Sequence, residues 1–186
     1  STATAWPEAT SRWLRDTSPM TGIDSTRLQR YLDEKDIIDL MIRYADRIDA
    51  NDPIGSAACF CPDGVGFYWG EFTGRAAIAE RLAGILDQFL CTSHHLTNPI
   101  ITIDGDRATA RSYVYAFHRR RKDGLPYWVS ARWIDRIVRT PNEGWLFERR
   151  EVATVGSVVA EDVERRLDHP NHPGRLDRPL GVWPLA

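Results

Sequence analysis

Residues 35–50 read KDIIDLMIRYADRIDA, and this stretch decides how the first half of the chain folds. Its apolar side chains recur at the spacing of one face of a helix. The stripe consists of Ile37, Met41, Tyr44 and Ile48. Cap-type residues at 24–26 favour a helix start before it, and Asn51-Asp52-Pro53 ends it because proline cannot continue a helix. We therefore predict one long amphipathic helix.

Asp49 continues an apolar row of this helix. Ile38, Ile42 and Ala45 form that row, and Asp49 is its next member. Asp46, in contrast, lies on the polar face. A carboxylate that faces the core is costly unless a partner holds it, which makes Asp49 a candidate site residue. The alternative, slightly favoured by the helix alone, is a partly wetted acid at the helix end that accepts a bond from a nearby backbone N–H.

The spacing of apolar residues changes further along the chain, from that of helices to that of strands. A short helix at 54–60, a turn at 62–64, a strand at 65–72 and a second helix at 75–90 are expected first. Four segments then favour strands, at 96–103, 107–121, 127–139 and 145–154, with short Asp/Asn/Gly turns between them. Strands joined by tight turns form an antiparallel meander, so helices followed by this meander predict an α+β fold.

Length and composition limit the range of partners. With 186 residues the chain suits one domain at 25–160, preceded by an arm at 1–24 and followed by a proline-rich tail at 161–186. The formal net charge of -2 gives no overall positive field to attract nucleic acid or an anionic membrane. No apolar run approaches the ~20 residues of a membrane span, and no signal peptide is visible. We expect a cytoplasmic protein without nucleic-acid or membrane partners.

Three cysteines, Cys59, Cys61 and Cys91, fit a reducing compartment better than a disulfide framework. Their closeness in sequence to His94 and His95 raises the alternative of a zinc site. The two separated Cys-x-x-Cys-like pairs that are usual for structural zinc are missing, however. We expect small buried thiols, no metal and no cofactor.

Histidines in residues 92–98, TSHHLTN, are the candidate partners of Asp49. Adjacent residues that enter a strand point to opposite faces, so at most one of His94 and His95 faces a cavity. A carboxylate bonded to one imidazole nitrogen fixes the tautomer and leaves the other nitrogen free to take a proton. His118 is a further candidate, because it stands at the end of a strand face of small residues: Ala108, Ala110, Ser112, Val114 and Ala116. Equally, these small residues could simply accommodate a covering helix.

The basic run Arg119-Arg120-Arg121-Lys122 leads into a turn at Asp123-Gly124. A phosphate or nucleic-acid contact is one interpretation of such a run. In a chain with an acidic total, a solvated hairpin tip is strongly preferred.

Five motifs, taken in order, resemble the SnoaL-like branch of the NTF2-like superfamily. They are Asp36–Asp49, Phe60-Cys61-Pro62-Asp63-Gly64, Gly74-Arg75-Ala76-Ala77-Ile78, His94-x-x-x-Asn98 and Asp104-Gly105-Asp106-Arg107-Ala108, and together they cover about residues 33–152. This branch includes scytalone dehydratase, bile-acid dehydratase, a hexachlorocyclohexane dehydrochlorinase, ketosteroid isomerase and polyketide cyclases. The motifs are most similar to those of the scytalone dehydratase and bile-acid dehydratase type.

The resemblance implies an NTF2-like (cystatin-like) cone, in which N-terminal helices pack on a curved, mostly antiparallel sheet, assembled as a homodimer or homotrimer. It implies that Asp49 pairs with His94, which lies four residues before Asn98. It also places Tyr44 near the substrate, and His118 matches the second histidine of scytalone dehydratase.

The functional hypothesis is a cofactor-independent lyase of secondary metabolism, most simply a dehydratase. His94, oriented by Asp49, removes a proton from carbon, while Tyr44 or a protonated His118 polarises oxygen or protonates the departing hydroxyl. The expected substrate-binding residues, which suit a small, apolar, hydroxylated ring, are Tyr68, Trp69, Phe72, Asn98, Trp128 and Trp133. Two alternatives stay open: an isomerase or cyclase of a polyketide- or terpenoid-like substrate in the same pocket, and a non-catalytic ligand-binding or assembly subunit.

Overall fold

The computed structural model describes residues 24–159, so the arm predicted before residue 24 and the tail predicted at 161–186 lie outside the described residues. The elements are α1 (Ser25–Asp49), α2 (Pro53–Ala57), β1 (Phe60–Phe67), β2 (Glu71–Thr73), α3 (Arg75–Leu86), β3 (Phe89–Asp104), β4 (Arg107–Arg120), β5 (Pro126–Thr140) and β6 (Gly144–Val159). Within the described residues, no helix is both long and apolar enough to cross a membrane.

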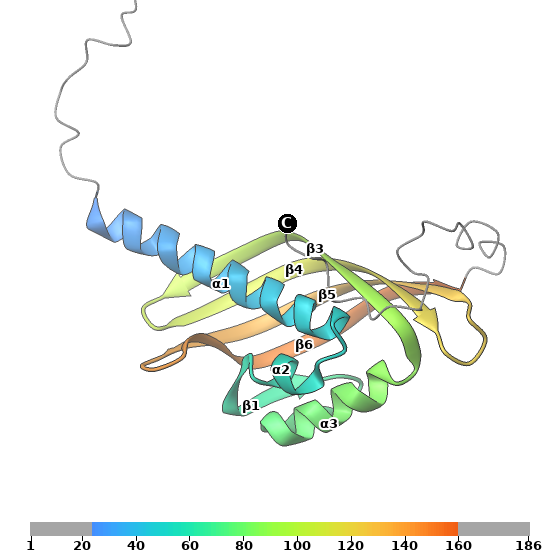
Figure 1. Cartoon of the computed structure of the whole chain (residues 1–186). Coiled ribbons are helices and arrows are strands. Elements are labelled where there is room, and N and C mark those ends of the chain that lie inside the picture. The colour runs from blue at the N-terminus through green and yellow to red at the C-terminus, as the bar shows by residue number, and fades with distance from the viewer. Residues whose placement is uncertain (1–23, 160–186) are drawn as a thin grey trace, which may run out of the picture.

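One curved sheet of six strands, in the order β2-β1-β6-β5-β4-β3, forms the body of the domain. All neighbouring strands run antiparallel except β1 and β6, which are parallel. The three helices lie on one side of the sheet, with α1 running across it (Figure 1). The predicted α+β fold, with helices packed on a curved, mostly antiparallel sheet, is therefore confirmed.

The long helix predicted from residues 35–50 is confirmed as part of α1. Its N-cap is Asp24, whose carboxylate accepts the backbone N–H of Thr26. The predicted apolar stripe is its buried face, since Ile37, Met41 and Tyr44 are almost fully enclosed. The helix ends at Asp49, followed by the C-cap Ala50 and then by Asn51, which has a positive φ of 55°.

The chain between α1 and β3 differs from the prediction in three places. The turn expected at 62–64 lies inside β1, and the short helix expected at 54–60 ends at Ala57. The single strand expected at 65–72 is divided at 68–70, where the Tyr68 N–H donates to the Gly70 carbonyl at 2.9 Å and Trp69 has a φ of 57°. This tight reversal turns the chain back as β2, and it moves Tyr68 and Trp69 out of the regular strand pattern.

Helix α3 ends at Leu86 and not at residue 90, and β3 begins at Phe89 and not at residue 96. The reason is strand pairing with β4, since Phe89 pairs with Arg120 and Ser93 pairs with Phe117. Residues 89–95 are therefore part of the sheet, because they form strand hydrogen bonds although the apolar pattern before them is helical. The predicted turns at 104–106, 123–124 and 142–144 are confirmed.

The sheet has an inner face toward the helices and an outer face toward solvent. Inner-facing residues of β4 are the predicted row of small side chains, and each is buried: Ala108, Ala110, Ser112, Val114, Ala116 and His118. Tyr113 and Tyr115, between them, are exposed on the outer face. Because the inner row is short, α1 and the sheet enclose a cavity near its His118 end.

Candidate active site

The end of α1 meets the beginning of β3 through Asp49. Its Oδ1 lies 2.6 Å from Nδ1 of His94, and its Oδ2 accepts the backbone N–H of His94 at 2.7 Å. The Thr92 hydroxyl donates to Oδ1 at 2.8 Å. One carboxylate therefore holds both the main chain and the imidazole of His94 in place.

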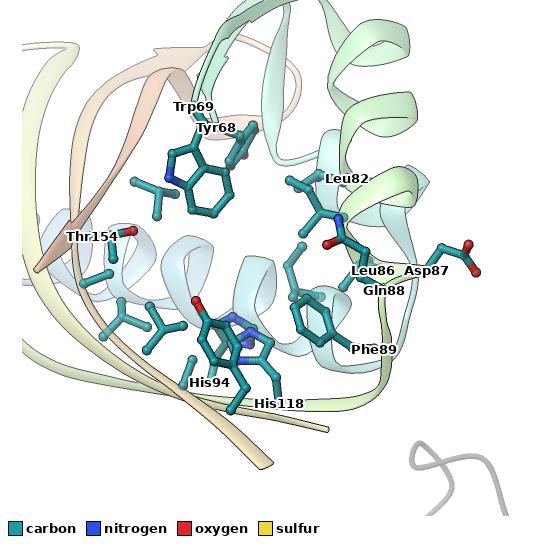
Figure 2. A pocket seen from close by; sticks show the side chains of 18 of the residues that line it. Tyr68, Trp69, Leu82, Leu86, Asp87, Gln88, Phe89, His94, His118 and Thr154 are labelled. Carbon is teal, nitrogen blue, oxygen red and sulfur yellow. The ribbon is translucent and has the colours of Figure 1, made fainter. Parts of the chain in front are cut away.

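His94 directs its ring toward a cavity (Figure 2). The adjacent His95 is exposed. This agrees with the expectation that at most one of the two adjacent histidines faces inward. Nδ1 donates to Asp49 when the imidazole is neutral, so Nε2 carries the free lone pair. His94 is positioned as a proton acceptor at the cavity wall.

Asp49 keeps its charge in this setting. Burial by itself raises the pKa of the carboxyl, but the hydrogen bonds and charge of His94, helped by the Thr92 hydroxyl, outweigh it and leave the pKa below its usual value. Both sequence interpretations of Asp49 hold at once, because it accepts a backbone N–H and also an imidazole.

His118 lies beside His94, with ring centroids 5.4 Å apart and planes almost perpendicular. Burial, together with the nearby His94, lowers the pKa of His118 from 6.5 to about 4. Its Nδ1 is buried without a hydrogen-bond partner in the described residues. At neutral pH the ring is uncharged, so the structure does not support the alternative in which a protonated His118 acts as the acid.

Two tyrosines form a hydrogen-bonded pair at the cavity wall. The hydroxyl oxygens of Tyr44, from α1, and Tyr68, from the β1–β2 reversal, are 2.8 Å apart. Burial raises the pKa of Tyr44 to about 12, against the pull of the Arg150 charge, and burial beside Tyr44 raises that of Tyr68 well above its usual value. Both phenols stay protonated, so the pair has one O–H left for a ligand after one hydroxyl donates to the other.

An ion pair that we did not predict lies behind the tyrosines. Arg150 donates to Asp135 through Nε at 2.8 Å and Nη2 at 2.7 Å, and both side chains are fully enclosed. The guanidinium carbon lies 4.4 Å from the ring centre of Tyr44 and 4.2 Å from that of Trp133. The sequence does contain a signal: Asp135 alternates with Trp133 and Ile137, so its carboxylate had to face the core and needed a cation there.

The cavity has a volume of about 800 Å³, which suits a small-molecule ligand. Its enclosed wall is mainly apolar and includes Ile48, Leu82, Leu86, Val114, Ala116, Ala131 and Trp133. The polar side chains that line the cavity include His94, His118, Tyr44, Tyr68, Tyr127 and Thr154. Figure 2 shows Trp69 and Tyr68 across the cavity from His94 and His118.

Of the predicted binding residues, Tyr68, Trp69 and Trp133 line the cavity and three others do not. Phe72 packs against the core beneath Arg81. Trp128 lies on the outer face, where its ring contacts Phe117. Asn98 is exposed at a break in the β3–β4 register and has a φ of 50°.

The basic run reaches a hairpin tip where Arg121 and Lys122 are exposed, as the preferred interpretation of a solvated tip expects, and part of it also lies at the cavity. Arg120, Arg121 and Lys122 are all lining residues, and Arg81 of α3 joins them.

Cys59, Cys61 and Cys91 are free thiols. Across residues 24–159, no group of three or more His, Cys, Asp or Glu side chains is arranged to hold a metal ion.

Comparison with known proteins places this geometry in a family. The model of the SnoaL-like domain matches residues 29–151. A protein of Novosphingobium aromaticivorans assigned as a scytalone dehydratase is 30% identical, with a TM-score of 0.66, covering 74% of this chain and 92% of its own. A protein of the same organism assigned as an aromatic ring hydroxylase is 28% identical, with a TM-score of 0.65, and the match covers 70% of this chain and 94% of that protein. Comparison with curated proteins gave no match.

A third solved structure, from Nostoc punctiforme, is a protein of unknown function with a cystatin-like fold. It is 27% identical, with a TM-score of 0.57, and covers 66% of this chain and 91% of its own. The predicted NTF2-like (cystatin-like) architecture is thus confirmed.

Proposed function

The chain belongs to the SnoaL-like domain family, and from this premise we propose that it is a cofactor-independent lyase, most simply a dehydratase. The observation that carries the proposal is the bond of 2.6 Å between Asp49 and Nδ1 of His94, with the imidazole at the wall of an apolar cavity. The relative assigned as a scytalone dehydratase supports the reaction class.

The proposed reaction uses His94 as base and then as acid. Nε2 takes a proton from a carbon next to a carbonyl or aromatic ring, and the electron pair of that C–H bond forms the new double bond. The hydroxyl on the neighbouring carbon leaves with its bonding electrons and departs as water after it takes the proton from His94. Positioned proton transfer of this kind contributes roughly 10²–10⁴ in rate.

The tyrosine pair is the proposed electrophile. Tyr44 and Tyr68 are neutral, and their free O–H donates to the substrate oxygen on which negative charge develops. Arg150, 4.4 Å from the Tyr44 ring centre, is a positioning residue that supplies positive charge behind the phenol. The apolar wall, with Trp133, suits a hydroxylated ring substrate.

Isomerisation or ring closure of a polyketide- or terpenoid-like substrate begins with the same proton abstraction. Product mass separates these reactions, because dehydration alone removes one water. A non-catalytic binding or assembly subunit is the remaining alternative, and it requires no proton abstraction at all.

The test is a panel of hydroxylated cyclic ketones and phenolic substrates incubated in D₂O and followed by mass spectrometry. We expect loss of water, and deuterium beside the carbonyl of the remaining substrate wherever the abstracted proton exchanges with solvent and a deuteron returns before the hydroxyl leaves; both signals should be abolished in His94→Gln. The matched control is His95→Gln, which changes the adjacent, outward-facing histidine and should retain activity. Deuterium uptake without loss of water favours the isomerase or cyclase, whereas neither signal across the panel favours the non-catalytic alternative.

We also propose that the outer face of the sheet forms a homodimer or homotrimer contact. Apolar side chains exposed on β4, β5 and β6 support this proposal: Tyr113, Tyr115, Ile134, Val155 and Val158. Exposed apolar area of this kind on a sheet face is typical of a protein contact.

A further inference from the structure

Positive charge gathers at the open end of the cavity. The lining residues there that are exposed to solvent include Asp87, Gln88, Arg121 and Lys122. With the partly exposed Arg81 and Arg120, the lining holds four basic side chains and one acidic side chain. We call Arg81, Arg120, Arg121 and Lys122 the basic rim.

The basic rim is only partly neutralised by its neighbours. Arg120 is paired with Asp123. Arg121 donates to the carbonyls of Asp87 at 2.7 Å and Phe89 at 3.1 Å, which uses two of its five N–H groups and does not cancel its charge. Its separation from the Asp87 carboxylate is 3.8 Å, and Figure 2 shows that carboxylate pointing away from the cavity.

Two other members of the rim also have unused donors. Arg81 donates one N–H to the Tyr68 carbonyl at 3.0 Å, but its Nε is buried without a partner in the described residues. Lys122 makes no hydrogen bond or ion pair with any residue of the described range. Because the chain as a whole has a net charge of -2, this local excess of positive charge is not a property of the whole surface.

The interior has the opposite character. Its wall is mainly apolar, His118 is neutral and the tyrosine pair offers one free O–H, so a fully charged anion placed there would exchange most of its hydration for few hydrogen bonds. A charged substituent is stable only at the exposed end, where guanidinium and ammonium groups can reach it.

We propose that the substrate is amphipathic: an apolar ring fills the cavity, and an anionic substituent, either a carboxylate or a phosphate, is bound at the basic rim by Lys122 and Arg121. This inference rests on the proposed function for the placement of the ring at His94. It adds a specificity determinant, because ring compounds without the anion lose the rim contact.

The test is binding by calorimetry with three probes that share one ring system: 1-naphthylacetate, its primary amide and 1-naphthyl phosphate. We expect an anionic probe to bind more tightly than the neutral amide, with an advantage that shrinks as salt rises. Preference for the acetate or for the phosphate identifies the source of the negative charge.

Lys122→Gln should reduce the advantage of the anion over the amide about two- to fivefold, the range of a solvent-exposed ion pair. Lys35→Gln is the matched control, since it makes the same change of charge on α1, where Lys35 pairs with Asp39. Affinity for the amide should stay unchanged in both variants.

Equal binding of the amide and the anions, equal effects of Lys122→Gln and Lys35→Gln, or no binding of any probe would each overturn the inference. None of these measurements uses turnover. If the lyase reaction fails while the anion preference holds, only the proposed chemistry is wrong. If turnover is found and the preference is absent, only the rim proposal is wrong.

Discussion

Asp49 binds His94 at two atoms at once, the backbone nitrogen at 2.7 Å and ring Nδ1 at 2.6 Å. The first bond fixes where β3 starts relative to the end of α1, and the second fixes how the imidazole is turned. The same carboxylate therefore has a structural and a chemical role, and these can be separated by substitution.

Asp49→Asn should separate them. The amide oxygen can still accept the backbone N–H of His94, but its NH₂ group then faces Nδ1 and favours the tautomer that carries the proton on Nε2. We expect kcat to fall on the order of 10²–10⁴-fold, with a melting temperature close to that of the native protein.

Steady-state kinetics on a substrate found by the D₂O panel, together with thermal denaturation, measures both effects. Asp46→Asn provides the control, because Asp46 lies on the exposed face of the same helix. A variant that keeps full kcat would show that Asp49 is not part of the mechanism. An unfolded variant would show that the main role of Asp49 is structural.

His118 should make the protein less stable as the solution becomes mildly acidic. An unfolded histidine takes up a proton near pH 6.5, whereas His118 in the folded protein does so only near pH 4. Between these values the unfolded state binds more protons, so the free energy of unfolding falls as pH drops from about 6.5 to about 4. The loss in the free energy of unfolding is zero above pH 6.5 and reaches at most about 3 kcal/mol near pH 4.

Urea denaturation of His118→Asn between pH 4.5 and 7 tests this window. The variant should show a flatter dependence on pH than the native chain. His95→Asn, at an exposed position, should keep the native slope, and an unchanged slope in His118→Asn would show that this ring is not the titrating group.

Arg150→Met should be strongly destabilising. It leaves the Asp135 carboxylate enclosed without its cation, and breaking a buried pair in this way costs about 3–5 kcal/mol. The double change Arg150→Met with Asp135→Leu should recover much of the loss, because no unpaired charge then remains. Arg149→Met, which breaks the more exposed pair with Glu71, should cost about 1 kcal/mol or less in the same chemical denaturation experiment.

Tyr115→Arg should disrupt the proposed contact between copies. Tyr115 is 53% exposed on the outer face of β4, so an isolated domain should tolerate the change. We expect light scattering after size exclusion to show a smaller assembly at an unchanged melting temperature per subunit. Thr109→Arg, at an exposed position nearer the end of β4, is the control, and a native protein that is already monomeric would contradict the proposal.

Much of the site could be predicted because helix and strand periods assign side chains to faces. The alternation that separates His94 from His95 is confirmed, and Asp49 does reach the cavity side of α1, although Ile42 of the predicted row is 50% exposed. The same rule was available for the tryptophans, since Trp128 and Trp133 are an odd number of residues apart in one strand and cannot share a face. Only Trp133 lines the cavity.

The rest depends on irregular backbone and on contacts between distant segments. Trp69 has a φ of 57° within a reversal that no periodicity indicates, and this turn sets the position of Tyr68. Asn98 lies where the register of β3 shifts, so counting from His94 fails there. The basic rim needs the end of α3 to meet the β4–β5 hairpin, which is a property of the assembled fold.

Strand β6 is the last strand of the sheet in the sequence, yet it lies between β1 and β5. It is the strand through which β1 joins the meander, and its pairing of Phe60 with Phe147 links distant parts of the chain. A nascent chain that has reached only β5 has open strand edges and an Asp135 without its cation. Closing such distant pairings is slow. Helix α1 and Asp49 are therefore synthesised early, but the cavity wall is complete only after β6, which contributes Val152 and Thr154, has been synthesised.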